Sequence, residues 1–108
     1  GLVGARAVRV SRAQERQHHE REMAQVSERR ERQLQDRYQQ FYRSELLRLR
    51  QAMGAEALAA LEEQVRQGLG DEANGIGARF LIRVRVDQIL VQQHQVPSFE
   101  QWRQQNPG

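Results

Sequence analysis

The sequence predicts an all-α fold, a small bundle of three to four helices with a long, polar N-terminal helix. Glycine and proline are absent from residue 5 through residue 53, and the Arg, Gln and Glu residues that dominate this stretch favour helix. After residue 34, apolar residues recur at helical spacings of three and four. Only residues 80–91 alternate like a strand, and a lone strand would leave its backbone groups unpaired.

The change of pattern near residue 34 predicts two parts. Residues 1–33 are expected to be a polar connector or N-terminal helix extension, because residues 11–33 hold too few apolar positions to form a stripe. Ser11 and Gln14 fit a capping box, which predicts that the helix begins there, after a tail formed by residues 1–10. Residues 34–108 are expected to form the helical bundle domain. The first residue is Gly rather than Met, which suggests a piece of a longer protein.

Residues 34–53 predict an amphipathic helix. Its apolar stripe consists of Leu34, Tyr38, Phe41, Tyr42, Leu46, Leu49 and Met53. Gly54 should end this helix, and residues 55–69 then predict a shorter one that is stopped by Gly68 and Gly70. Its apolar residues share one face, which makes it the expected antiparallel partner of the first stripe.

The segment from residue 80 to residue 91 admits two interpretations. Ile82, Val84 and Val86 alternate with arginines, as in a strand. A helix explains the segment equally well, and we predict a helix because the sequence offers no second strand. Since this helix would be apolar on two sides, it should be the central and most buried one.

The C-terminal segment predicts a short capped helix. Ser98 is expected to be its N-cap, with Gln101 at the reciprocal position of a capping box. Phe99 and Trp102 then form an apolar cluster with Val96, and we expect these two aromatic residues to be structural anchors on the bundle. The aromatic residues at 38–42 should pack in the core; the alternative is a base-stacking surface next to Arg37 and Arg43.

Charge is distributed unevenly along the chain. All 17 basic residues are Arg, against 14 acidic residues. Residues 1–50 hold 12 of the arginines and 7 acidic residues, whereas residues 51–108 hold 5 and 7. A basic first half attracts polyanions. Two simpler explanations stay open, a GC-rich genome that favours Arg over Lys and a solvated helix face of mixed charge.

Residues suited to catalysis are scarce, so no catalytic residue, metal site or cofactor is expected. Cysteine is absent, which removes thiolate ligands and nucleophiles. His18 and His19 are adjacent, so on a helix they diverge by about 100° and cannot both reach one metal ion. No apolar run is long enough for a membrane span or a signal peptide. We therefore expect a non-enzymatic, cytoplasmic protein without a membrane partner.

The chain from Tyr38 onward resembles the C-terminal regions of bacterial plasmid replication initiator (Rep) proteins. The shared order is Tyr-Gln-Gln-Phe-Tyr at 38–42, Ala-Leu-Ala-Ala-Leu-Glu-Glu at 57–63, a long apolar helix, and a closing Val-Pro-Ser-Phe-Glu-Gln-Trp at 96–102. Only the closing motif has any specificity. The resemblance implies origin recognition on double-stranded DNA and recruitment of the host replicative helicase. It names no site residue, because the winged-helix domains of such initiators are not in this sequence.

Two functions follow as hypotheses. In the first, the chain is the non-catalytic C-terminal module of a plasmid replication initiator and contacts DNA phosphates through arginines of its first half. The candidate contact residues are Arg12, Arg16, Arg29, Arg30, Arg37 and Arg43. In the second, it is a helical protein–protein interaction module that forms a homo-oligomer and binds no nucleic acid. A continuous heptad seam would favour the second, and residues 11–33 contain none.

Overall fold

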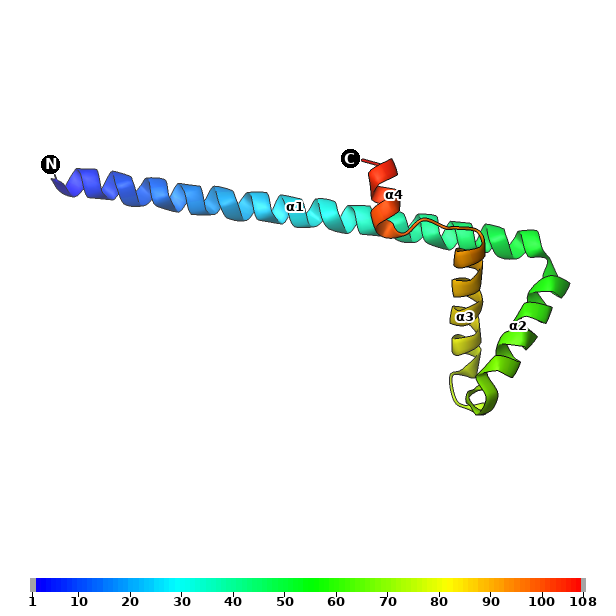
Figure 1. Cartoon of the computed structure of the whole chain (residues 1–108). Helices are drawn as coiled ribbons and strands as arrows, with labels where there is room; N and C mark the ends of the chain where they lie inside the picture. Colours follow the sequence, from blue (N-terminus) through cyan, green and yellow to red (C-terminus); the bar gives the residue numbers. More distant parts are fainter. Residues whose placement is uncertain (1, 108) are drawn as a thin grey trace. The chain divides into compact units, whose positions relative to one another are not determined.

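The computed structural model of the chain describes the backbone of residues 2–107 and the side chains of residues 11–107. The elements are α1 (Leu2–Met53), α2 (Ala55–Leu69), the short 3-10 helix η1 (Gly70–Asn74), α3 (Ala78–Gln93) and α4 (Phe99–Gln105) (Figure 1). No strand occurs among these residues. The all-α prediction is confirmed, and so is the choice of a helix for residues 80–91.

The chain divides into two compact units, Gly1–Asp36 and Arg37–Gly108. The N-terminal unit is a single stretch of α1, in which every side chain from Ser11 to Gln25 is exposed. The prediction of a helix start at Ser11 is wrong, because α1 begins at Leu2 and Ser11 lies inside it. Gly and Pro are absent from residues 5–53, so nothing stops the helix at Ser11, and it extends back past Gly4 to Leu2.

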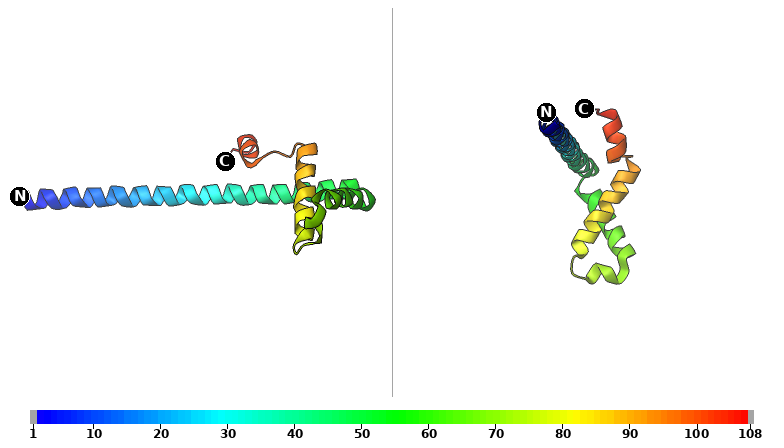
Figure 2. Two further views of the ribbon diagram at one scale, coloured as in Figure 1. Left: turned by 60° about the horizontal axis from the view of Figure 1, so that its bottom comes forward. Right: turned by 90° about the vertical axis from the view of Figure 1, so that its left-hand side faces the viewer.

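The core of the C-terminal unit lies where three helices meet. The buried cluster consists of Leu46 and Leu49 from α1, Val65 from α2, and Ile82, Val86 and Leu90 from α3. α2 diverges from α1 after the turn instead of lying along it, and α3 runs back toward α1 (Figures 1 and 2). The α1 stripe therefore packs against α2 and α3 together, and the expectation that residues 55–69 lie antiparallel along it is wrong.

Glycines set both ends of α2. Gly54 has a φ of 84°, a conformation that L side chains rarely adopt, and it ends α1 at Met53. Gly70, with a φ of 60°, follows the last residue of α2. The predicted bounds of residues 55–69 are confirmed. Gly68, also expected to stop the helix, lies within it.

α3 is buried on one side only. Its core side carries Ala78, Ile82, Val86 and Leu90. On the other side, Phe80 is 69% exposed and Leu81 is 42% exposed. The expectation that this helix is the most buried one is confirmed, since α3 supplies four of the eight buried hydrophobic residues among those described. Its second apolar side is not covered, because only α1 and α2 supply the other buried residues of the core cluster.

α4 is held by its cap and by aromatic packing. The Ser98 side chain accepts a hydrogen bond from the Gln101 backbone N–H at 3.2 Å, and the Gln101 side chain accepts one from the Ser98 N–H at 3.0 Å. The predicted capping box is confirmed. Trp102 is only 9% exposed, and the Tyr38 hydroxyl donates to the Pro97 carbonyl at 2.8 Å. This hydrogen bond attaches the turn before α4 to α1.

The described helices show no candidate membrane span, since none of them combines sufficient length with sufficient apolar character.

Candidate nucleic-acid interface

The candidate contact residues of the N-terminal unit are Arg12, Arg16, Arg29 and Arg30, and all four are exposed. No ion pair joins any of them to an acidic residue in the described part of the chain. Arg29 differs from the others because its Nε donates to the Gln25 carbonyl at 3.4 Å. In this segment the His18 Nε2 lies 2.9 Å from the Glu22 carboxylate, which is a contact between neighbours on the helix and involves none of the four arginines. The arginines are thus available to an external anion.

Helix geometry brings three of these arginines onto one face. Arg12 and Arg30 are 18 residues apart, about five full turns, and Arg16 lies about 40° from the line between them. We call Arg12, Arg16 and Arg30 the arginine face. The residues of 11–36 within about 40° of this line are Arg12, Arg16, His19, Met23, Val26, Arg30 and Leu34.

Acidic residues are absent from this sector but flank it. Glu15 lies about 60° from the line, and Glu20 and Glu22 lie about 80° from it. None of these three forms an ion pair with Arg12 or Arg16. Arg29 lies about 100° from the line and so does not belong to the arginine face. The other arginines of the far side alternate with acidic residues. The acidic and arginine residues of 11–36 that lie more than about 60° from the line are Glu20, Arg21, Glu22, Glu28, Arg29, Glu31, Arg32 and Asp36.

The last two candidates, Arg37 and Arg43, belong to the C-terminal unit and are exposed. They are six residues apart, which places them about 120° from each other around α1. Arg43 lines a shallow pocket together with Tyr42, Leu46 and Asp87, whereas Arg37 does not. The structure therefore does not bring these two together.

The aromatic residues near Arg37 and Arg43 pack against one another. The Tyr38 ring lies 5.4 Å from the Phe99 ring and 5.7 Å from the Trp102 ring, and Phe41 stacks on Trp102 at 6.3 Å between centroids. Burial raises the pKa of Tyr38 above its ordinary value, and the nearby Tyr42 adds to the effect. Because these rings contact other rings, the geometry favours a structural cluster over a base-stacking surface.

No group of three or more potential ligands among His, Cys, Asp and Glu comes together in the described residues. Sequence reasoning did miss a second group of arginines, Arg50, Arg66, Arg79 and Arg83, which line a cleft in the C-terminal unit. The one local signal was the four-residue spacing of Arg79 and Arg83. The other two arginines come from different helices, so only the fold brings them together.

Comparison with protein-family models, with curated proteins and with solved structures finds no match to this chain.

Proposed function

We propose that this chain is a non-catalytic helical module that contacts DNA through phosphate groups. The observation that carries the proposal is the arginine face, on which Arg12, Arg16 and Arg30 are exposed and have no acidic partner. Together with the resemblance to plasmid replication initiators, this supports a C-terminal module of such an initiator. It would act in the cytoplasm, with host replication proteins such as the replicative helicase as further partners.

The spacing of the arginine face suits a phosphate backbone. Arg12 and Arg30 are separated by about 27 Å along the helix axis, about the length of eight base pairs of duplex. Guanidinium groups bind phosphate oxygens with two parallel hydrogen bonds, which makes arginine well suited to this contact. Phosphate contacts carry no sequence information, so binding should show little sequence preference.

The expected affinity is that of non-specific binding, with a Kd of about 10⁻⁴–10⁻⁶ M. Three phosphate contacts give a slope of about −2.7 in a plot of log affinity against log salt, so raising salt from about 50 to about 200 mM should weaken binding about 40-fold. This steep dependence is the property that separates a phosphate interface from an apolar protein interface.

The experiment compares two variants with the same change in charge. Arg12→Gln/Arg16→Gln/Arg30→Gln removes the arginine face. The matched control, Arg21→Gln/Arg29→Gln/Arg32→Gln, removes three arginines from the side that also carries Glu22, Glu28 and Asp36. A labelled duplex is titrated at several salt concentrations, with a single strand of the same sequence in parallel.

The face variant should lose most of the salt dependence, and the control should keep most of it. Equal losses in both variants would show that net charge alone drives binding and that the face has no role. No binding by the unmodified chain at low salt would refute DNA contact and leave the second candidate function.

The second candidate, a helical protein–protein interaction module, is favoured by the uncovered side of α3. Phe80 and Leu81 are exposed there, and Ile76 is exposed in the preceding loop. Large exposed apolar residues that lie close together are typical of interaction surfaces. Sedimentation of the whole chain and of Phe80→Ser tests this function: a self-associating chain should become monomeric in the variant. A chain that is monomeric at all concentrations would remove the homo-oligomer from consideration.

A further inference from the structure

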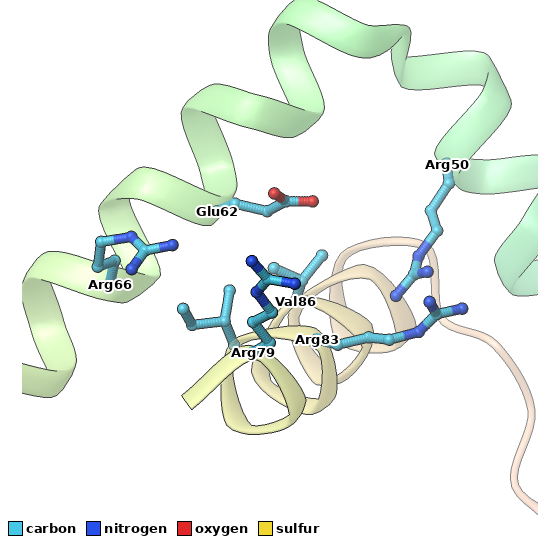
Figure 3. Close-up of a pocket in the computed structure, with 7 residues that line it drawn as sticks. Arg50, Glu62, Arg66, Arg79, Arg83 and Val86 are labelled. Atoms are coloured by element: carbon cyan, nitrogen blue, oxygen red, sulfur yellow. The ribbon is translucent and has the colours of Figure 1, made fainter. Parts of the chain in front are cut away.

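An arginine-lined cleft lies among three helices of the C-terminal unit, and its volume is about 350 Å³. Arg50 enters from α1, Glu62 and Arg66 from α2, and Arg79 and Arg83 from α3, as Figure 3 shows. The remaining lining residues are Ile82 and Val86. Four arginines and one carboxylate line the cleft. Arg66 also pairs with Glu63 at 3.5 Å and Arg50 pairs with Asp87, so the surplus of positive charge comes from Arg79 and Arg83. We call this site the arginine cleft.

The two arginines of α3 have no partner within the protein. Neither Arg79 nor Arg83 forms a hydrogen bond or an ion pair with any residue that the structure describes. Glu62 faces the same space (Figure 3) but lies too far from them for an ion pair. Their charge is therefore unbalanced inside the cleft.

The position of Arg79 at the start of α3 favours the binding of an anion. Helix N-termini carry a partial positive charge and normally have acidic residues in their first turn. The first turn of α3 contains no acidic residue and has Arg79 at its second position. An anion bound next to Arg79 and Arg83 would neutralise the charge of both arginines and the partial positive charge of the helix N-terminus.

Arg50 supplies a further, independent observation. One terminal nitrogen of the Arg50 guanidinium pairs with the Asp87 carboxylate, and the other nitrogens do not take part in this ion pair. Its Nε is buried and has no hydrogen-bond acceptor in the protein. Buried donors without a partner are rare and costly, so an unmet acceptor is expected nearby.

We propose that the arginine cleft binds one phosphoryl group, held by Arg79 and Arg83 and supported by Arg50 and Arg66. Ile82 and Val86, both buried, form an apolar floor, while Arg79 and Arg83 are exposed and can reach a ligand from solvent. The phosphoryl group belongs either to a small phosphate compound or to a nucleic-acid backbone. The site consists of residues of the C-terminal unit and does not depend on the arginine face of α1.

The test uses the whole, ¹⁵N-labelled chain titrated with inorganic phosphate at constant ionic strength. Amide signals around residues 62–66 and 79–83 should shift with a saturable dependence. Arg79→Gln/Arg83→Gln should weaken phosphate binding at least about tenfold, since both charge-assisted hydrogen-bond donors are lost. Glu62→Gln should strengthen binding, because it removes the one carboxylate that lines the cleft.

Arg48→Gln/Arg85→Gln is the matched control. It removes the same charge from the same unit, but Arg48 pairs with Glu45 and Arg85 bonds with Gln88, and neither lines the cleft. The control and the arginine-face variant should both bind phosphate like the unmodified chain. Equal weakening in the control and the cleft variant would overturn the proposal, and so would unchanged binding in the cleft variant.

A second arm identifies the source of the phosphoryl group. If the cleft holds a backbone phosphate, then Arg79→Gln/Arg83→Gln should weaken duplex binding and inorganic phosphate should compete with the duplex. If it holds a small phosphate compound, duplex binding should be unchanged in this variant while phosphate binding is still lost. Either result supports a phosphate site in the arginine cleft. If the duplex does not bind at all, the proposed function is refuted, whereas the phosphate titration still tests the arginine cleft.

Discussion

Replacing Trp102 by Ala is the most informative test of how the C-terminal unit is held together. Trp102 is buried in α4 against Tyr38 and Phe41 of α1 and against Phe99, with ring centroids between 5.7 and 6.4 Å apart. The substitution removes the largest side chain of this cluster. Because α4 has only seven residues, few other contacts can compensate for the loss.

The loss of unfolding free energy expected for Trp102→Ala depends on whether α4 stays docked. Truncation of a buried Trp to Ala costs about 3–5 kcal/mol when the rest of the structure stays in place. For a unit of this size, about 3 kcal/mol corresponds to a fall in Tm of about 12 °C or more. If α4 instead detaches, the loss stops at the free energy with which α4 is docked, and the core of α1, α2 and α3 unfolds separately.

Thermal unfolding followed by circular dichroism measures the loss, and two further variants separate its causes. Trp102→Phe keeps an aromatic ring and should lose much less stability. Ser98→Ala removes the cap and should cost about 1 kcal/mol. In a Trp102→Ala background, Ser98→Ala should have no further effect if α4 has already detached.

Trp102 is the only tryptophan, so its fluorescence reports the docking of α4 directly. Emission at short wavelength and poor quenching by iodide are expected for the buried ring. A fall in Tm below about 2 °C for Trp102→Ala, together with strong quenching in the unmodified chain, would refute the anchoring role.

Further predictions concern single side chains of the same unit. Tyr38→Phe removes the hydrogen bond to the Pro97 carbonyl and should cost about 1 kcal/mol at pH 7, measured by urea unfolding. Because burial raises the pKa of Tyr38, the folded state holds this proton more tightly than the unfolded state does. The stabilisation is complete below the unfolded pKa of about 10 and is lost as pH rises above it, so Tyr38→Phe should lose less stability than the unmodified chain as the pH is raised above about 10. The chain has no Lys or Cys whose titration would obscure this comparison. Gly54→Ala should destabilise by about 1–3 kcal/mol because of its φ of 84°, whereas Gly68→Ala, inside α2 with open space around it, should stabilise by up to about 1 kcal/mol. A loss of stability in both glycine variants would contradict the backbone explanation for Gly54.

Features that depend on neighbouring residues were predictable from the sequence. Gly54 and the apolar spacing of residues 55–69 fixed both ends of α2, because helix ends depend on local backbone conformation. Ser98 and Gln101 identified the capping box for the same reason. The start of α1 was not predictable, since the capping pattern at Ser11 did not end the helix and Gly4 did not interrupt it.

Features that depend on three-dimensional arrangement were not predictable. Alternating and helical patterns indicated that α3 is apolar on two sides, but not that Phe80 and Leu81 would stay uncovered. Arg50, Arg66 and Arg79 are widely separated in the sequence and line one cleft only because α3 runs back toward α1. A list of arginines by position could not show that Arg79 has no carboxylate partner while Arg66 pairs with Glu63 and Arg48 pairs with Glu45.

Whether an arginine has an acidic partner also separates a phosphate-binding surface from an ordinary solvated surface in this protein. The chain has 17 arginines and 14 acidic residues, so the surroundings of each arginine decide how much charge it presents. Arg32 has acidic neighbours on both sides, since Glu28 and Asp36 lie four residues before and after it on α1. An arginine surrounded by acidic residues offers little net attraction to a polyanion, because the opposing charges screen one another over a few ångströms. The arginine face and the arginine cleft differ in that acidic residues are absent or outnumbered at the contact surface itself, so the local charge, rather than the small net charge of the chain, should determine where phosphate binds.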